Sequence, residues 1–404
     1  MQTYLLALNP TDSVISGFLP AAGRLGLSVT LLTDQPGAYG PPGDLGPDVE
    51  VAACDVRDHR AVITNISRRG QPAAVFTNSD HLQTQGALAA EFFGLPGKDW
   101  RATLRTKDKA LMRRHLAAAG AEPVRAVEIL PGQSPAACVE AGQEAGGVVY
   151  PCVVKPRDGV ASEDVVRAEG PTELLRLCEE IRARRPDAAL VVEEFLPGEL
   201  YTLETLGDGG RLHVLGGFHT RLSPPPHFIE QRLTYVPDHP APVREQILEQ
   251  LALLGVGLGA CHTEFVVHEG RARIIEVNYR AIGDHGDLLL AELLDIPLFD
   301  HILATHMGEG LPESLGARTD RAARIDSPCA DRAGVLASAP GAVDRAEGDV
   351  RLTYRPMRPT GERHPLHRTN RDYLGILRTI GPDQDSVDRA ADAFLAAQLW
   401  EITP

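Results

Sequence analysis

The sequence lacks any apolar run near twenty residues, the length that a membrane-spanning helix needs. Its formal net charge of -15 argues against nucleic-acid binding and against a polybasic membrane patch, since both use basic surfaces. The opening residues, MQTYLLALNP, lack the basic and long apolar segments of a signal peptide. We therefore expect a cytoplasmic protein without nucleic-acid or membrane partners. A homodimer is one assembly that the sequence leaves open.

Closely spaced cysteine pairs and a dinucleotide fingerprint are also absent. The six cysteines are scattered without a CxxC pair, which in a chain of 404 residues indicates reduced thiols rather than disulfides or a zinc site. The turn after the first expected strand reads NPTDS and contains no GxGxxG motif, so dinucleotide binding there is not favoured.

Lysine is scarce, because arginine supplies nearly all of the positive charge. Only four of the 40 basic residues are lysines: Lys98, Lys107, Lys109 and Lys155. A compact ammonium group suits a point contact with phosphate. A retained lysine can therefore mark a phosphate site, although chance survival remains the alternative for each one.

Strands alternate with helices in the first hundred residues. Apolar stretches predict strands over residues 3–10, 28–34, 49–55 and 73–80, with helical stretches between them. This alternation predicts an α/β region with a mostly parallel, open sheet. Farther along, residues 103–120 predict one amphipathic helix, and residues 188–206 predict two strands broken at Pro197-Gly198. After residue 311 we expect loops, short strands and a closing helix.

The segment RARIIEVNYRAIG, residues 271–283, places polar side chains along a buried strand. Glu276, Asn278 and Arg280 follow at steps of two and should share one face. The strands 261–267 and 272–278 flank HEGR, which predicts a hairpin. If its loop has three residues, 269–271, then Glu264 lies opposite Glu276, with Cβ atoms about 4.5–5.5 Å apart.

Two facing carboxylates repel each other unless a cation lies between them. Glu264 and Glu276, with the amide oxygen of Asn278, form a ligand set that suits Mg²⁺ or Mn²⁺ better than zinc. Because Mg²⁺ usually binds one or two carboxylates together with phosphates, a nucleotide should complete the site. The alternative is an exposed sheet whose glutamates face water, and a register slip of one residue would separate the pair.

The pattern E-x11-E-x-N-x-R, preceded by two spaced lysines, resembles the ATP-grasp ligases over residues 1–310. The resemblance implies an ATP-grasp fold with an N-terminal open αβ domain. It also implies ATP and Mg²⁺ (or Mn²⁺) as cofactors and Glu264, Glu276 and Asn278 as metal ligands. The implied regions are an N-terminal domain (1–100), a small subdomain with a lid (101–195), a large subdomain with the metal site (196–310) and a C-terminal α+β portion (311–404).

Further site residues follow from the same resemblance. Lys109, which should open a helix, and Lys155 match the two ATP lysines, and Arg280 matches the arginine that holds the acyl phosphate or substrate carboxylate. Lys155 and Arg280 are therefore the catalytic candidates. The lid is the segment PRDGVASEDV (156–165), which contains Ser162. The adenine hinge is VVEEFLPG (191–198), with Glu193 near the amino group and the Glu194, Phe195 and Leu196 backbone on the ring edge.

The lid and the ribose position depart from the family pattern. Ala161 and Asp164 stand where a Gly-rich lid would place glycines, and Asp164 near phosphates is unfavourable unless it points away or helps to hold metal. The ribose acid is expected two residues after the hinge glycine, whereas Glu199 comes one residue early and Leu200 follows it. Either a bulge brings Glu199 to the ribose or the ribose is held in another way.

The Pro-rich segment 216–238 resembles ATP-grasp amino-acid ligases, which join a carboxylate to an amine. The expected acceptor residues are Arg221, His227, Glu230 and Arg232, of which Glu230 could attract a substrate ammonium; a solvated loop is the alternative. The helix that begins near Gly283 has free N–H groups that could bind a substrate carboxylate. His285 is a candidate contact there, or else a polar cap.

Three functions remain open from the sequence. The first is an ADP-forming carboxylate–amine ligase that acts on small-molecule carboxylate and amine substrates. The second is another ATP-grasp chemistry, such as a carboxylase or a purine-pathway ligase, although the chain has no biotin-carrier segment. The third is a nucleotide-binding protein without catalysis, for which the atypical lid is the argument.

Overall fold

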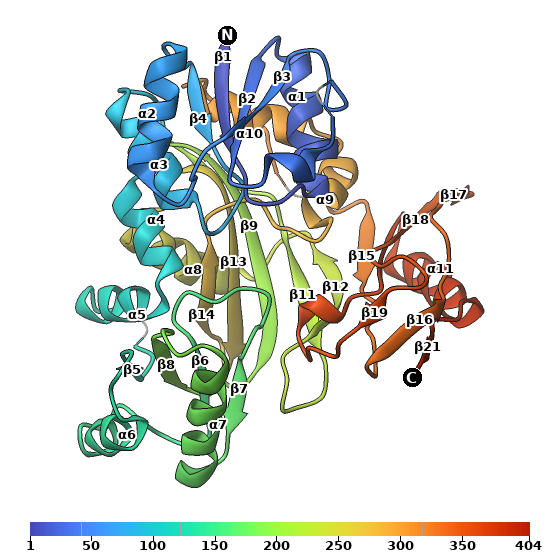
Figure 1. Cartoon of the computed structure of the whole chain (residues 1–404). Helices are drawn as coiled ribbons and strands as arrows, with labels where there is room; N and C mark the ends of the chain where they lie inside the picture. Colours follow the sequence, from blue (N-terminus) through green and yellow to red (C-terminus); the bar gives the residue numbers. More distant parts are fainter. Residues whose placement is uncertain (42, 122, 317) are drawn as a thin grey trace.

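The computed structural model describes residues 1–41, 43–121, 123–316 and 318–404. Their strands form four sheets: an N-terminal parallel sheet, a small antiparallel sheet, one long sheet that extends into the C-terminal region, and a three-stranded sheet in that region (Figure 1). Within these ranges no helix is both long enough and apolar enough to cross a membrane. All six cysteines are free.

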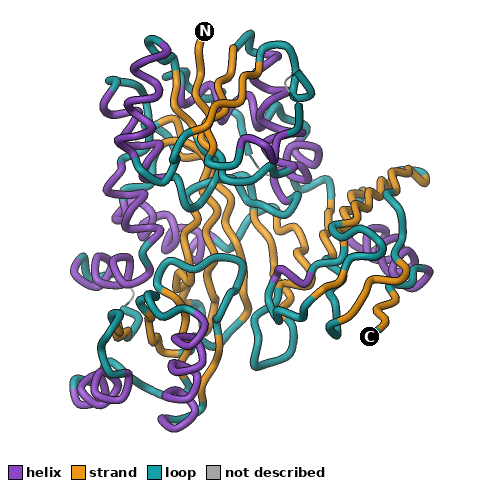
Figure 2. The backbone as a smooth tube through the Cα atoms, viewed as in Figure 1, coloured by secondary structure: helices purple, strands orange, loops and turns teal. Residues whose placement is uncertain are grey.

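The N-terminal sheet is entirely parallel, as predicted, with helices on both faces (Figure 2). Side chains alternate along its central strand, so Leu5 joins one apolar core while Tyr4 and Leu6 join another. Its elements are β1 (Gln2–Leu6), η1 (Ser13–Phe18), α1 (Leu19–Arg24), β2 (Ser28–Thr33), η2 (Pro36–Tyr39), β3 (Val49–Ala53), α2 (His59–Arg69), β4 (Ala74–Phe76) and α3 (Gln83–Phe92).

The helix predicted over residues 103–120 is in fact two helices separated at Asp108. The Asp108 carboxylate accepts a hydrogen bond from the Leu111 N–H at 2.9 Å, which caps the second helix and breaks the first. Lys109 is consequently the first residue of a helix, as predicted. These helices are α4 (Trp100–Lys107) and α5 (Lys109–Ala118).

The small antiparallel sheet has the strand order β5-β8-β6-β7. Its elements are β5 (Ala126–Ile129), α6 (Pro135–Glu144), β6 (Cys152–Pro156), β7 (Val166–Ala168), α7 (Pro171–Arg184) and β8 (Leu190–Glu194). The lid segment 156–165 connects β6 to β7, and the hinge segment connects β8 to the long sheet.

The long sheet has ten strands and runs through the expected boundary at residue 310, because β12 pairs with β15. It contains β9 (Glu199–Asp208), β10 (Leu212–Val214), β11 (Gly217–Leu222), β12 (Glu230–Val236), β13 (Leu258–His268), β14 (Arg271–Asn278), β15 (Ala322–Asp326), β17 (Val343–Glu347), β18 (Val350–Pro356) and β20 (Gly375–Gly381). The predicted break between β8 and β9 at Pro197-Gly198 is confirmed.

The remaining helices flank this sheet and the remaining strands form a third antiparallel sheet. The helices are α8 (Ala241–Leu254), α9 (Gly286–Leu294), α10 (Leu298–His306), η3 (Asn370–Asp372) and α11 (Gln384–Ala397). The third sheet contains β16 (Gly334–Ser338), β19 (Arg363–His364) and β21 (Glu401–Thr403). The predicted closing helix is therefore present, although a short strand follows it.

The β13–β14 hairpin pairs Glu264 with Glu276, as predicted, although the predicted loop length is wrong. The turn has two residues, Glu269 and Gly270, with φ of 51 and 76, values that suit a type I′ hairpin turn. Phe265 pairs with Ile274, and Ile275 is an extra residue before the Glu264–Glu276 pair. This β-bulge restores the register that a three-residue loop would have produced.

Candidate active site

A cavity of about 420 Å³ lies between the small sheet, the hairpin and the C-terminal region. It brings together most of the predicted site residues: Lys109, Lys155, Ser162, Glu193, Glu194, Phe195, Leu196, Glu230, Arg232, Glu264, Glu276, Asn278, Arg280 and Gly283. The cavity therefore joins the lid, the hinge and the expected metal ligands in one site, which no single sequence segment defines.

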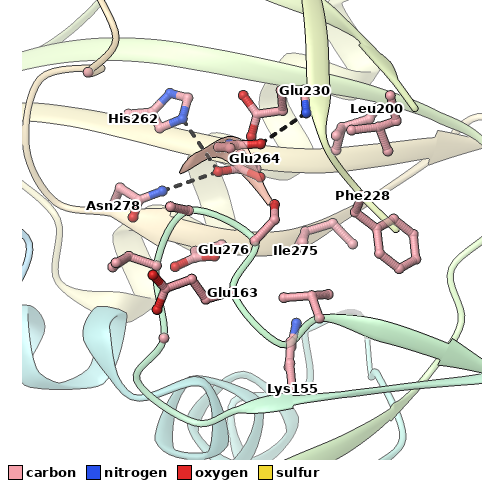
Figure 3. A pocket seen from close by; sticks show the side chains of 18 of the residues that line it. Lys155, Glu163, Leu200, Phe228, Glu230, His262, Glu264, Ile275, Glu276 and Asn278 are labelled. Atoms are coloured by element: carbon pink, nitrogen blue, oxygen red, sulfur yellow. Dashed lines mark hydrogen bonds and ion pairs between the residues drawn. The ribbon is translucent and has the colours of Figure 1, made fainter. Parts of the chain in front are cut away.

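The two hairpin glutamates face this cavity together with Asn278 (Figure 3). Glu276 Oε1 lies 2.9 Å from Lys109 Nζ, and Glu264 Oε1 accepts a hydrogen bond from Asn278 Nδ2 at 3.3 Å. Lys109 thus balances the charge of Glu276, whereas the neutral Asn278 amide only donates a hydrogen bond to Glu264. His262 Nε2 is a further neighbour, 3.5 Å from Glu264 Oε1.

This donor set fits a divalent cation with oxygen ligands. The described residues contain no group of three or more His, Cys, Asp or Glu side chains arranged for metal binding. Glu264, Glu276 and Asn278 supply two carboxylates and an amide, so phosphate oxygens would have to complete the coordination, as is usual for Mg²⁺. Glu230 and Asp284 add further acids to the cavity lining, and a bound cation would reduce the repulsion among these carboxylates.

His262, which the sequence analysis missed, is a residue of β13 that lines the cavity and carries a positive charge. Its Nδ1 lies 2.7 Å from Glu204 Oε1, and both side chains are buried. Burial alone would lower the pKa of His262, but the carboxylates of Glu204 and Glu264 outweigh burial and raise that pKa to about 10. The resulting imidazolium lowers the pKa of Glu264 against the opposing effect of burial, so Glu264 is ionised near neutral pH.

A buried charge cluster occupies the position predicted for adenine recognition. Glu193 is held by Lys155 Nζ at 2.7 Å and by Arg113 Nε at 2.9 Å. Burial would raise the pKa of Glu193, but these two cations lower it to about 2. The ionised Glu193 carboxylate is therefore engaged by Arg113 and Lys155 in this structure, at the position where adenine recognition was predicted. Arg113 was missed, although its position four residues after Lys109 puts both on one helix face.

Two backbone N–H groups of the hinge already donate hydrogen bonds within the protein. The Glu194 N–H donates to the Arg125 carbonyl at 3.0 Å, and the Phe195 N–H donates to the Pro151 carbonyl at 3.0 Å. Neither donor is free to reach an adenine ring edge in this arrangement. Glu194, Phe195 and Leu196 all line the cavity, and the hinge contact with adenine stays a prediction.

The lid retains Gly159, and three of its other residues adopt backbone conformations typical of glycine. Ala161, Ser162 and Asp164 have φ of 56, 55 and 56, in the left-handed region that favours glycine. Asp164 points away from the cavity, because its carboxylate pairs with Arg184 at 2.6 Å and with Arg185 at 2.8 Å. The expected conflict between Asp164 and phosphates is thereby avoided.

Arg280 lines the cavity but is paired with an acid from the N-terminal unit. Its Nη2 and Nε lie 2.7 and 2.8 Å from Asp80 Oδ2. Asp80, which the sequence analysis missed, follows β4, where the carboxyl ends of parallel strands usually meet ligands. Lys107 is a further cation near Asp80, and burial lowers its pKa although Asp80 opposes that effect.

Four predicted contacts lie outside the cavity lining. Glu199 is 71% exposed and pairs with His219, because strand alternation turns Leu200 inward in its place (Figure 3). Arg221 is exposed on β11, whereas the adjacent Leu222 lines the cavity. His227 Nε2 is 3.4 Å from Arg368 Nη1 at the edge of the site.

His285 is the fourth of these residues, and it pairs with an acid of the N-terminal unit instead of facing the cavity. Its Nε2 lies 2.5 Å from Asp12 Oδ2, and it is the residue that precedes α9. The first turn of α9 contains the buried Asp287, which disfavours a second anion there. Gly283 and Asp284 reach the cavity, whereas the helix N-terminus predicted to bind a carboxylate does not.

Glu230 is the one predicted acceptor acid that faces the cavity. Its N–H donates to Asn370 Oδ1 at 3.1 Å, and its carbonyl accepts from the Tyr373 hydroxyl at 2.8 Å. Burial and the repulsion from Glu264 raise the pKa of Glu230 to about 8. Asn370 and Tyr373 also line the cavity and were missed, because no local pattern relates them to β12.

Comparisons with known proteins agree with this arrangement. Residues 148–287 match the profile of the ATP-grasp domain. The uncharacterized protein y4rH of Sinorhizobium fredii (strain NBRC 101917 / NGR234) is 29% identical over 427 residues, which cover 100% of this chain and 84% of that protein.

Solved structures share the fold over the whole chain. L-amino acid ligase from Bacillus licheniformis has a TM-score of 0.79 at 21% identity, over 100% of this chain and 99% of that chain. Phosphoribosylglycinamide synthetase from Anaerococcus prevotii has a TM-score of 0.73 at 15% identity, over 100% of both chains. The biotin carboxylase domain of Hydrogenobacter thermophilus 2-oxoglutarate carboxylase, solved with MgADP and bicarbonate, has a TM-score of 0.71 at 15% identity. The match covers 100% of this chain and 91% of that chain.

These likenesses confirm the expected α/β architecture, and the profile match falls on the segment that contains the lid, the hinge and the β13–β14 hairpin. The chain therefore contains a segment, residues 148–287, that matches the ATP-grasp domain, and it shares its overall fold with these solved structures.

Proposed function

We propose that the protein is an ATP-dependent ligase that activates a carboxylate as an acyl phosphate and joins it to an amine, releasing ADP and phosphate. The observation that carries this proposal is the cavity itself. Its lining contains the two facing glutamates, Glu264 and Glu276, together with three cationic residues: Lys109, Lys155 and Arg280. Such a site suits a polyanion bound through a divalent cation.

The charge distribution supports the first chemical step. A carboxylate and the γ-phosphate are both anions, so their approach needs fixed positive charge. Lys109 and Lys155 would contact the phosphates, and Arg280 would hold the carboxylate or the acyl phosphate. Mg²⁺ or Mn²⁺, held by Glu264, Glu276 and Asn278, would supply further charge neutralisation at the phosphate oxygens.

The second step needs an amine at the acyl carbon and exclusion of water. Glu230 is the proposed contact for the ammonium form of the acceptor, because it is a cavity acid whose ionisation is disfavoured until a cation arrives. Phe228 and Leu222 also line the cavity and suit an acceptor with an apolar group. The lid over the phosphates would limit access of water to the acyl phosphate.

An ATP-to-ADP assay with panels of carboxylic acids and amines tests this function. The proposal predicts ADP and phosphate release that requires one acid and one amine together, with an amide product of matching amount. Turnover that depends on bicarbonate would instead indicate a carboxylase. Tight ATP binding without turnover in any combination would indicate a nucleotide-binding protein without catalysis.

A further inference from the structure

A short C-terminal segment, residues 368–373, contacts both the lid and the strand that carries Glu230. We refer to it as the C-terminal turn. It contains η3 and is held by Asp372, whose side chain is fully buried. The Asp372 carboxylate accepts hydrogen bonds from His364 Nε2 at 2.8 Å and from the Arg368 and Thr369 N–H groups at 2.5 and 3.3 Å. This bonding fixes the conformation of the C-terminal turn.

Two contacts join the C-terminal turn to the lid. The Asn370 N–H donates to the Ala161 carbonyl at 3.3 Å. The Arg371 guanidinium pairs with the Glu163 carboxylate, which also pairs with Arg185. Glu163 is only 14% exposed, whereas Arg371 is 56% exposed. The lid acid is thus held between Arg185, the residue that follows α7, and the C-terminal turn.

The same turn holds the proposed acceptor acid. Asn370 Oδ1 accepts from the Glu230 N–H, and the Tyr373 hydroxyl donates to the Glu230 carbonyl. One residue, Asn370, therefore uses its backbone to bind the lid and its side chain to bind β12. The contacts to the lid and to Glu230 therefore come from the same turn.

We propose that Arg371 is a positioning residue that keeps the lid closed over the cavity while the C-terminal turn holds the amine side of the site. This inference rests on the proposed function. Its consequence is coupling, because the acyl phosphate is protected from water only when the contacts to the lid and to β12 are both formed.

The cost of losing this contact follows from the chemistry of the intermediate. If the lid opens early, a water oxygen attacks the acyl carbon and the C–O bond to phosphate breaks. Phosphate leaves, the original carboxylate is restored and a proton is released. ATP is then consumed without amide formation, so the ratio of phosphate to amide reports on lid closure.

The test compares Arg371→Ala and Arg371→Lys with Arg332→Ala as the matched control. Arg332 also forms an exposed ion pair, with Asp331, and does not line the cavity. Two readouts are needed: amide hydrogen exchange of residues 157–165 with MgADP bound, and phosphate released per amide formed. Because Arg371 is exposed, its substitution should leave the fold intact, which the exchange pattern of β13 and β14 checks.

We expect Arg371→Ala to raise lid exchange about two- to fivefold, the range for a partly exposed ion pair, and to raise phosphate per amide. Arg371→Lys should recover most of both values, and Arg332→Ala should match the wild type. Unchanged lid exchange and an unchanged phosphate-to-amide ratio in Arg371→Ala would overturn the inference. If the wild type forms no amide with any pair, the proposed function fails, whereas the exchange readout still decides whether Arg371 holds the lid.

Discussion

Lys109 Nζ lies 2.9 Å from Glu276 Oε1 and 3.0 Å from the Gly159 carbonyl. A single ammonium group therefore connects α5, the β13–β14 hairpin and the lid. Lys109 is only 4% exposed, so this contact forms where water screens charge poorly. In the proposed function, the nucleotide phosphates and a divalent cation would bind between Lys109 and Glu276. Lys109 would then contact a phosphate, and Glu276 would bind the metal.

Replacing Glu276 by Gln should abolish most turnover and leave the protein folded. The amide keeps the shape of the side chain but removes the charge that balances Lys109 and would bind metal. We expect kcat/KM to fall by at least about 100-fold, the scale of losing one preorganised electrostatic contact. Steady-state ADP release measures this, with circular dichroism as the check on folding.

The control for that variant is Glu199→Gln, which makes the same chemical change at an exposed residue outside the cavity. Its activity should equal that of the wild type. Activity retained by Glu276→Gln would show that the metal assignment is incorrect.

Replacing Lys155 by Met should weaken nucleotide binding. Methionine keeps the apolar stem of the side chain in place and removes the ammonium. We expect the Kd for MgATP to rise by about tenfold or more, because hydrogen bonds to charged groups contribute roughly 1.5–3 kcal/mol. Isothermal titration calorimetry measures the effect. An unchanged Kd would mean that Lys155 serves only its buried pair with Glu193.

Replacing Glu230 by Gln should act on the amine and spare the nucleotide. The substitution removes the proposed partner of the substrate ammonium but keeps the backbone bonds to Asn370 and Tyr373. We expect the KM for the amine to rise about tenfold or more, by the same scale for a charged hydrogen bond. The KM for ATP should change less than twofold. An equal rise in both KM values would contradict this assignment.

Asp287 gives a prediction about stability against pH. Its side chain is fully buried in the first turn of α9, and burial raises its pKa from 3.8 to about 6. The folded state therefore binds a proton more tightly than the unfolded state, so stability falls as pH rises from about 4 to about 6. The loss that Asp287 contributes above pH 6 is of order 3 kcal/mol.

Asp287→Asn should remove this pH dependence and raise the Tm near pH 7.5 relative to the wild type. Thermal unfolding between pH 4.5 and pH 8 measures it. Asp349→Asn, at an exposed position, is the matched control and should follow the wild-type curve. A wild-type Tm that does not decline between pH 4.5 and pH 6.5 relative to Asp287→Asn would contradict the prediction.

The hairpin could be predicted because its signals are local. The turn chemistry at Glu269-Gly270 and the spacing of the two glutamates determine which residues face each other. The loop length was wrong by one residue, and the bulge at Ile275 cancelled that error. Lys109 at a helix start and Lys155 at a strand end could be placed for the same reason, since each position depends on nearby sequence.

The partners of these residues could not be predicted, because they come from distant parts of the chain. Asp80 lies 200 residues before Arg280, and Asn370 lies 140 residues after Glu230. Only the folded topology brings such pairs together. Glu199 was misplaced for a different reason: strand alternation at the start of β9 turned Leu200 rather than Glu199 toward the cavity.

The most direct test of the account is a crystal structure with MnADP, using the anomalous signal of manganese to locate the ion. The account predicts a manganese peak within about 2.5 Å of carboxylate oxygens of both Glu264 and Glu276, bridged to the ADP phosphates. A nucleotide bound elsewhere, or a manganese ion that contacts neither glutamate, would contradict it.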